Sequence, residues 1–265
     1  MKKPTMGIQL YTLRDYIKTA KDFDITLGRL EQMGVKDVQI SGIGDISAEI
    51  QRDILLKHGM KVCITHKQFD RMENDLSALM SEHKTIECDA IGIGSAPSDS
   101  RGNLMRVRSF IERAEAVSKT LKENGFSFNY HDHAFEFYRL DDSKKSMMDI
   151  LIEETDPELF SFIPDVAWIH FALNNPVDVL QKMKGRIKVL HFKDYKFDEN
   201  DVRHFVPLGQ GLVNLDECYQ AACELEIPYI MYEHDSDWPD NDPFKACEQS
   251  WKYMMELDKR YMQIK

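Results

Sequence analysis

Alternating apolar and polar positions mark eight short segments of the chain as strands. In residues 126–133, Phe126, Phe128 and Tyr130 alternate with polar side chains. A strand places alternate residues on opposite faces, so this segment has one apolar face and one polar face that needs partners. The same kind of β-rich run predicts strands near 6–11, 36–41, 60–66, 88–94, 126–133, 160–166, 186–193 and 228–235.

Helical patterns fill the intervals between these runs. In residues 103–124, apolar residues from Leu104 to Leu121 recur every three or four positions, behind Asn103 as a favourable N-cap. In residues 21–33 the same spacing stops before Gly34, a residue that is common just past a helix end. A last helix is predicted at about 242–260.

The alternation of eight strands with helices indicates an α/β protein with a parallel sheet. An open, doubly wound sheet has the same alternation. Eight units in 265 residues, without a linker or a shift in composition, favour a (β/α)8 TIM barrel instead. We therefore predict one domain that spans residues 1–265.

Composition narrows the function classes. The formal net charge of −11 argues against a general attraction to nucleic acid or to anionic membranes. No signal-peptide pattern opens the chain, and no apolar run approaches the roughly 18 residues of a membrane span. The five cysteines form no CxxC pair and are predicted to be reduced thiols. These features predict a soluble, cytoplasmic protein.

Titratable side chains gather at the predicted strand ends. The fifth strand ends in His131 and His133, the sixth in Asp165, the seventh in His191 and the eighth in Glu233. The strands of a parallel barrel end at a common face, where TIM-barrel active sites lie. A single Asp or His at a strand end is more often a cap or a buried polar residue. Four on adjacent strands favour a divalent metal site, with Mn²⁺ preferred and Zn²⁺ as the alternative.

The segment YHDHAFEF (130–137) resembles the YHNHDFEF strand of the sugar phosphate isomerase/epimerase family, the TIM barrels related to xylose isomerase and endonuclease IV. Further similar segments follow in order: GIQLYTLRD, DVAW, GRIKVLHFKD, VPLGQGLVNL and YEHD. The resemblance implies a metal ion beside a polyol or sugar carbonyl. By motif position Asp165, His191 and Glu233 are ligands, and His131 stands where many relatives carry glutamate. His133 lies on the same face of the strand as His131 and could take the strand-five position instead.

The chemistry that such a site supports is proton abstraction next to a carbonyl, because a cation stabilises the resulting enediolate. Glu233 is the predicted base, and Glu233 and His131 are the predicted catalytic residues. The chain lacks the strand-five glutamate, so a second base would be a histidine or Glu136, or would be absent. Gln39 also replaces an acid that many relatives use to bind sugar hydroxyls.

Several other side chains near the strand ends are candidates for substrate binding: Tyr11, His66, His133, Glu136, Trp168 and Lys193. Lys193 could polarise a substrate oxygen or form a salt bridge, and His66 could bind substrate or serve a structural role. Glu136 could bind hydroxyls or orient the ring of His131. The two aromatic residues would form an apolar wall for a sugar ring, although core positions suit them nearly as well.

Three functions are compatible with these features. The first is a metal-dependent isomerase or epimerase of a sugar, a keto-sugar or an inositol-derived ketone. The second is a dehydratase of a related keto-polyol, because the enediolate is shared. The third is a catalytically silent sugar-binding barrel. All three predict a small carbohydrate ligand, no nucleic acid and no membrane, and a homo-oligomer is compatible with each. The segment GIGIGSAPS lacks the spacing of nucleotide-binding loops.

Overall fold

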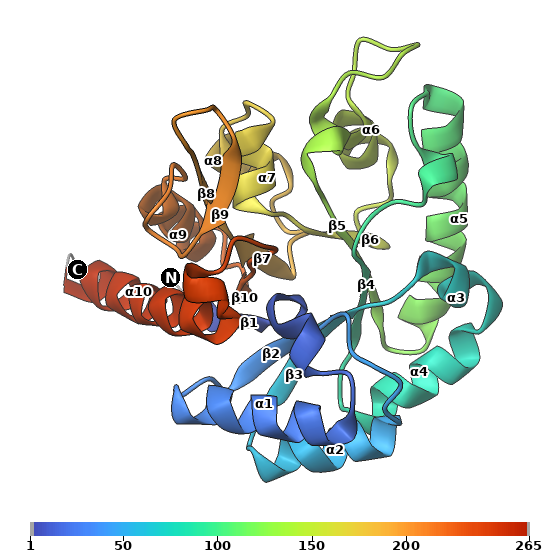
Figure 1. Ribbon diagram of the computed structural model, residues 1–265. Coiled ribbons are helices and arrows are strands. Elements are labelled where there is room, and N and C mark those ends of the chain that lie inside the picture. The colour runs from blue at the N-terminus through green and yellow to red at the C-terminus, as the bar shows by residue number, and fades with distance from the viewer. Residues whose placement is uncertain (1–2, 264–265) are drawn as a thin grey trace.

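The computed structural model describes residues 3–263 as a ring of strands surrounded by helices (Figure 1). The four terminal residues of the predicted domain (1, 2, 264 and 265) lie outside this range. The strands are β1 Thr5–Gln9, β2 Asp37–Ile40, β3 Lys61–His66, β4 Ala90–Ile93, β5 Ser127–His131, β6 Phe160–Ile163, β7 Val189–Phe192, β8 Asp194–Phe197, β9 Arg203–Val206 and β10 Tyr229–Tyr232. The α-helices are α1 Ala20–Gln32, α2 Ala48–Lys57, α3 Phe69–Asn74, α4 Leu76–Thr85, α5 Leu104–Glu123, α6 Met147–Glu154, α7 Val166–Phe171, α8 Pro176–Lys182, α9 Leu215–Glu224 and α10 Pro243–Gln263. Short 3-10 helices are η1 Leu10–Tyr16, η2 Ser98–Ser100, η3 Ala134–Phe137 and η4 Pro239–Asn241.

Eight parallel strands pair in the order β6-β5-β4-β3-β2-β1-β10-β7. Parallel bridges between Phe162 and Ile187 and between Asp165 and His191 join the two ends of this sheet. The result confirms the predicted single-domain (β/α)8 TIM barrel, and each of its eight strands falls within a predicted range or one residue before it. Among the described helices, none has the length and apolar character needed to cross a membrane.

The lower part of the barrel interior is apolar and tightly packed. Its buried residues are Cys63, Ile64, Ala90, Ile163, Val189 and Met231. Gly7 shows how tight this packing is, because a Cβ atom there would lie 2.7 Å from the Met231 sulfur and 2.1 Å from the Asp37 carbonyl oxygen. This layer closes the barrel interior beneath the carboxyl ends of the strands.

The outward faces of the strands pack against the helices. Phe128 and Tyr130 of β5 contact Phe160 of β6, and Tyr130 also contacts Phe110 of α5. Asn103 caps α5 as expected, since its side chain accepts a hydrogen bond from Arg106 N at 3.0 Å. The aromatic face of the predicted 126–133 strand therefore points outward, and its polar face points into the barrel.

A hairpin that the hydrophobic pattern did not predict follows β7. Strands β8 and β9 pair antiparallel, with Asp194 opposite Val206, and lie beside α7 in Figure 1. Asp194 also accepts hydrogen bonds from Gly209 N and Gly211 N, at 3.1 and 2.9 Å. A Cβ atom at Gly211 would lie 2.2 Å from an Asp194 oxygen, so this turn requires glycine. The carboxylate thereby anchors the 209–213 loop to the hairpin.

Candidate active site

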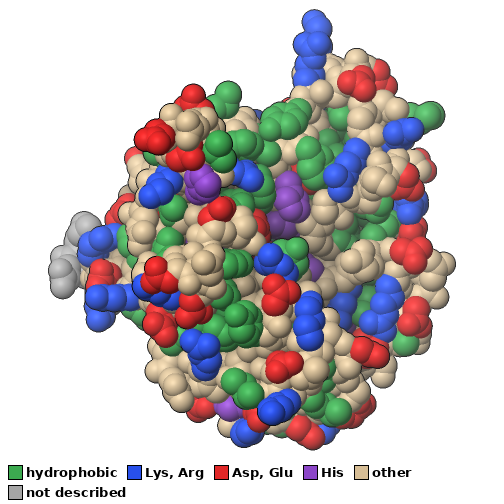
Figure 2. All heavy atoms as spheres, in the orientation of Figure 1, with side chains coloured by type: hydrophobic (Ala, Val, Ile, Leu, Met, Phe, Trp, Pro, Cys, Tyr) green, Lys and Arg blue, Asp and Glu red, His purple; other side chains and the backbone are tan. Residues whose placement is uncertain are grey.

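A cavity of about 580 Å³ opens where the barrel strands end. Figure 2 shows the corresponding hollow, with histidine side chains inside it. Six of the residues predicted from the sequence line the cavity: Tyr11, His66, His131, His133, Lys193 and Glu233. Its volume suits a ligand of sugar size, since small-molecule sites commonly occupy about 300–1,000 Å³.

The four predicted metal ligands converge at the floor of this cavity. His131, Asp165, His191 and Glu233 each present one ligand atom, and these atoms all lie within 4.8 Å of one another. The side chains come from the ends of β5, β6, β7 and β10, which are neighbours around the barrel. All four residues are at most 4% exposed. The structure thus brings together the residues that the strand-end pattern singled out.

Asp165 is held by the start of α7. Its Oδ1 accepts hydrogen bonds from Ala167 N at 2.9 Å and from Trp168 N at 3.1 Å, so it acts as an N-cap. Its Oδ2 is fully buried, has no hydrogen bond and lies 3.0 Å from Lys193 Nζ. A buried carboxylate oxygen without a hydrogen bond needs a cation nearby. The cap therefore aims Oδ2 at Lys193 and at the cluster.

The ring of His131 has a defined orientation. Its Nδ1 lies 3.1 Å from the Ile163 carbonyl, which requires a proton on Nδ1 and leaves the lone pair on Nε2. That Nε2 lies 4.0 Å from Glu233 Oε2. Burial, reinforced by the neighbouring His191, lowers the pKa of His131 well below its ordinary value. The ring is thus uncharged at neutral pH, as a metal ligand must be.

Gln39 connects two histidines beneath the cavity. Its Oε1 lies 2.7 Å from His191 Nε2, and its Nε2 lies 2.8 Å from His66 Nε2. His191 Nδ1 lies 2.9 Å from Glu233 Oε2, so this nitrogen faces the cluster. Burial, with a smaller effect of His191, lowers the pKa of His66 to about 3. Gln39 therefore orients both rings. The sequence showed only that glutamine stands where many relatives carry an acid, and it did not predict this role.

Lys193 lies among three carboxylates. Its Nζ is 3.0 Å from Asp165 Oδ2, 3.0 Å from Glu233 Oε2 and 2.9 Å from Asp235 Oδ2, and the residue is 1% exposed. Burial opposes its charge, but the three carboxylates outweigh burial and raise the pKa of Lys193 well above its ordinary value. Lys193 forms salt bridges and also lines the cavity, so both predicted roles, pairing with carboxylates and polarising a substrate oxygen, are compatible with its position.

The two central carboxylates respond differently to this environment. Burial favours the neutral form of Glu233, but Lys193 and His191 outweigh it and hold the pKa of this carboxyl well below its usual range. At Asp165, burial outweighs Lys193 and raises the pKa of the carboxyl. The cluster is therefore short of positive charge around Asp165.

The donor set fits a divalent cation. Three carboxylates (Asp165, Glu233 and Asp235) share the single ammonium group of Lys193. A divalent ion would add positive charge beside them, and Asp165 Oδ2 faces the cluster that would hold it. Two imidazoles and two carboxylates are suitable ligands for Mn²⁺ or Zn²⁺. The residues that would hold the ion are His131, Asp165, His191 and Glu233.

Glu136 does not line the cavity, contrary to the expectation that it contacts substrate or orients His131. It is fully buried in the turn after β5, where it accepts hydrogen bonds from Tyr130 OH at 2.7 Å and His133 N at 2.8 Å. Burial raises the pKa of Glu136 to about 8. The residue shapes the turn that presents His133, and Ile163 takes the place at His131 Nδ1.

Trp168 also lies behind the cavity wall rather than on it. Its ring contacts His133, with 5.5 Å between ring centroids, and Lys193 Nζ lies 5.3 Å from its centroid. Trp168 therefore supports cavity residues, whereas Tyr11, the other predicted aromatic wall, lines the cavity directly.

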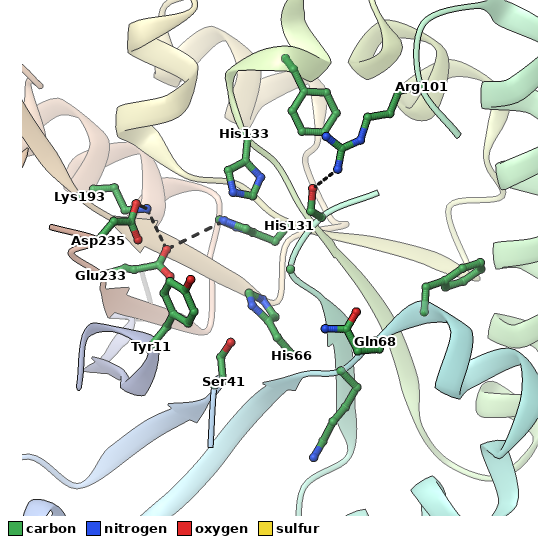
Figure 3. A pocket seen from close by; sticks show the side chains of 16 residues that line it. Tyr11, Ser41, His66, Gln68, Arg101, His131, His133, Lys193, Glu233 and Asp235 are labelled. Atoms are coloured by element: carbon green, nitrogen blue, oxygen red, sulfur yellow. Dashed lines mark hydrogen bonds and ion pairs between the residues drawn. The ribbon is translucent and has the colours of Figure 1, made fainter. Parts of the chain in front are cut away.

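Ten residues that line the cavity were not predicted from the sequence: Ser41, Gly42, Lys67, Gln68, Phe69, Gly94, Ser95, Arg101, Phe135 and Asp235. Asp235 falls within the quoted YEHD segment, two residues after Glu233 on the same parity, which was a usable signal. Arg101 lies in the loop after β4 and had no such signal, because its distance from the strand end is long. Figure 3 shows both residues at the cavity, on opposite sides.

Comparison with known proteins gives distant relatives. No family model matches the chain. The inosose dehydratase of Bacillus cereus (strain AH820) is 24% identical over 155 residues, which cover 53% of this chain and 51% of that protein. The inosose dehydratase of Lacticaseibacillus casei is 22% identical over 218 residues, which cover 77% of this chain and 67% of that protein. The chain thus spans about half of the first relative and about two thirds of the second.

Solved structures match over almost the whole chain. A sugar phosphate isomerase/epimerase from Parabacteroides distasonis ATCC 8503 has a TM-score of 0.81 and 20% identity, and covers 96% of each chain. The probable 3-DHS dehydratase AsbF from Bacillus anthracis has a TM-score of 0.74 and 13% identity, and covers 96% of this chain and 99% of that one. A xylose isomerase-like TIM barrel protein from Mycobacterium smegmatis, in complex with magnesium, has a TM-score of 0.68 and 13% identity over 97% of this chain and 98% of that one. At these identities the likeness shows the fold. The predicted resemblance is therefore confirmed at that level: the chain has the fold of the xylose isomerase-like TIM barrel proteins.

Proposed function

We propose that this protein is a divalent-metal-dependent enzyme that removes a proton next to the carbonyl of a polyhydroxylated ketone, with Glu233 as the base. One observation carries the proposal: the buried carboxylate of Glu233 lines the cavity and belongs to a cluster of four potential metal ligands at neighbouring strand ends. A bound divalent ion would act as a Lewis acid on the substrate oxygens.

The protein's own residues have distinct roles in this reaction. Glu233 Oε2 receives the contacts from His191 and Lys193, while the residue also lines the cavity and can reach a bound substrate. Lys193 is cationic and positioned to stabilise a developing oxyanion. His131 and His191 orient the ion, and His66 and His133 supply hydrogen bonds to hydroxyl groups.

The geometry favours chemistry with one base. Apart from Glu233, the only carboxylate on the described cavity wall is Asp235, and both contact the same Lys193 Nζ, so they lie on one side of the cavity. Epimerisation through two carboxylates on opposite faces of the substrate would need a carboxylate on the other side. A single base can take the α-proton and return it either to a departing β-hydroxyl group, which is dehydration, or to the neighbouring carbon, which is isomerisation.

Of these two outcomes, we favour dehydration, because the sequence relatives are named inosose dehydratases. Isomerisation, which the sequence motifs suggested first, is the second candidate, and the sugar phosphate isomerase/epimerase structures with the same fold support it. A catalytically silent sugar-binding barrel is the third candidate, and removal of the α-proton from any ketone would exclude it.

Proton NMR in D2O tests the proposal. The purified protein, loaded with Mn²⁺ and then freed of excess ion, is incubated with inosose and with simple keto-sugars. Loss of the α-proton signal that depends on protein and stops after treatment with a chelator is the expected result. Loss of a hydroxyl group in the product identifies dehydration, and a product of unchanged composition identifies isomerisation. No exchange with any of these ketones, in protein shown to bind the ion, would reject the function.

A further inference from the structure

The two sides of the cavity differ in charge balance. On one side, the carboxylates of Glu233 and Asp235 pair with Lys193. On the other side lies Arg101, from the loop between β4 and α5, whose guanidinium forms no ion pair with any described residue. Figure 3 shows Arg101 across the cavity from Lys193, beyond the histidines. A cation in a half-enclosed cavity without an acidic partner is suited to an anionic ligand.

The Arg101 side chain is held in place by neutral groups only. Its Nε donates to the Ala96 carbonyl at 3.1 Å, and its Nη2 donates to Ser95 Oγ at 2.8 Å. Its guanidinium carbon lies 4.0 Å from the centroid of the Phe135 ring, so the plane of the group is stacked. These contacts orient the guanidinium without neutralising it, and Nη1 has no hydrogen bond to any described residue.

The neighbouring wall offers no carboxylate that could neutralise Arg101. Its remaining lining residues on β3, β4 and the following loops are uncharged or cationic: His66, Lys67, Gln68, Phe69, Gly94 and Ser95. Lys67 also lines a neighbouring pocket together with Glu82, whose charge acts on it, so Arg101 is the cation that this wall offers to a ligand. This half of the cavity therefore carries excess positive charge, while the opposite half carries the carboxylate cluster.

We infer that the Arg101 wall binds the carboxylate of the substrate, which makes the substrate a polyhydroxylated keto acid rather than a neutral sugar. This inference rests on the proposed function for the orientation of the ligand, with its carbonyl at the His131–Glu233 cluster and its acid group at Arg101. A carboxylate matches one stacked guanidinium with a free Nη1, because both carry a single charge. A phosphate dianion would need more hydrogen-bond donors than this wall supplies.

Matched ligands test the inference by isothermal titration calorimetry. D-Glucuronate, D-glucose and D-glucose 6-phosphate share one ring and differ only at carbon six. We expect glucuronate to bind at least about tenfold more tightly than glucose, as charge-assisted hydrogen bonds allow. Arg101→Met should remove that preference and leave glucose unaffected, and Arg101→Lys should retain part of it. Arg108→Met is the matched control, since Arg108 is exposed and pairs with Glu154 outside the cavity.

Three outcomes would overturn the inference. The first is equal affinity for glucuronate and glucose, including no measurable binding of either, and the second is an equal loss of both in Arg101→Met. The third is a larger, Arg101-dependent gain from glucose 6-phosphate, which would assign the wall to phosphate esters. Repeating the titrations after chelation separates this inference from the proposed function: a preference that depends on Arg101 but not on metal keeps the acid site, even if no ketone ever exchanges its proton.

Discussion

Two layers of the barrel interior differ sharply although the same strands build both. The lower layer is apolar and close-packed, and the upper layer is polar and titratable. Along three strands, an apolar residue of the lower layer is followed two positions later by a titratable residue of the upper layer. The pairs are Ile163 and Asp165, Val189 and His191, and Met231 and Glu233. One step of the strand period therefore separates a residue that stabilises the fold from one that forms the candidate site.

The difference lies in what burial does to each layer. Burying apolar side chains stabilises the folded state, whereas burying carboxylates and imidazoles costs free energy unless they find partners. In the upper layer Lys193 and Gln39 provide part of that compensation, and the remaining negative charge calls for a cation. Substitutions in the two layers should therefore separate activity from stability.

The largest expected effect is on catalysis, at Glu233. Glu233→Gln keeps the size of the side chain but removes the base, so proton exchange from a ketone substrate should fall by roughly 10²- to 10⁴-fold. The measurement is the rate of α-proton loss in D2O. Glu256→Gln, on the exposed side of α10, is the control and should keep the full rate. Retention of exchange within threefold in Glu233→Gln would remove Glu233 from the mechanism.

Lys193→Met should be the most destabilising change in the upper layer. It leaves buried carboxylates without their cation, and breaking such a pair costs about 3–5 kcal/mol of unfolding free energy. Added Mn²⁺ should recover more stability in this variant than in the wild type, because the ion would replace the missing charge. Urea denaturation with and without Mn²⁺ measures both terms. An equal Mn²⁺ effect in the two proteins would argue against an ion bound by these carboxylates.

Met231→Ala tests the lower layer. The residue is fully buried beneath the cluster, and its truncation should cost about 2–5 kcal/mol by leaving a cavity. The turnover of the protein that remains folded should stay close to that of the wild type. Chemical denaturation and activity at low temperature give the two quantities. A loss of activity larger than the loss of folded protein would show that the two layers are coupled.

The smallest effect concerns pH. His131 and His133 have folded-state pKa values lowered by burial, for His133 to about 4, while unfolded histidine has a pKa near 6.5. Between these values the unfolded chain binds more protons, so stability should fall as the pH drops below 6.5, by up to about 1.4 kcal/mol per pH unit for a buried ring such as His131.

His204 provides a contrast of opposite sign. Asp237 and Asp198 raise the pKa of this exposed histidine, so its contribution is present at low pH and is lost as the pH rises. His133→Gln should flatten the decline of stability below pH 6.5, whereas His204→Gln should remove stability that the wild type gains between pH 7.5 and 6.0. Urea titrations at pH 7.5, 6.0 and 5.0 give the slopes, and a flat wild-type profile would contradict the neutral state of the buried rings.

Local patterns predicted most of the architecture. The eight barrel strands and the α5 cap at Asn103 were legible because a strand or helix with one buried face repeats its apolar residues at a fixed period. The β8–β9 hairpin was not, since its strands are partly exposed and carry no sustained apolar pattern.

The candidate site was only partly predictable. Strand-end position was enough to select Asp165 and Glu233, because parallel strands of a barrel end at one face. It could not reveal that Glu136, one turn beyond β5, is buried against Tyr130, nor that Arg101 returns to the cavity from a long loop. The course of a loop depends on contacts that have no period in the sequence.

The amino-acid order thus specified the barrel, through its alternation of strands and helices, and the titratable residues at the strand ends, because parallel strands of a barrel end at one face. Folding in three dimensions was needed to place Lys193 among three carboxylates, Gln39 between two histidines and Arg101 opposite them. These arrangements join residues that lie far apart in the chain. Their energies depend on distance and burial, quantities that no local pattern of residues contains.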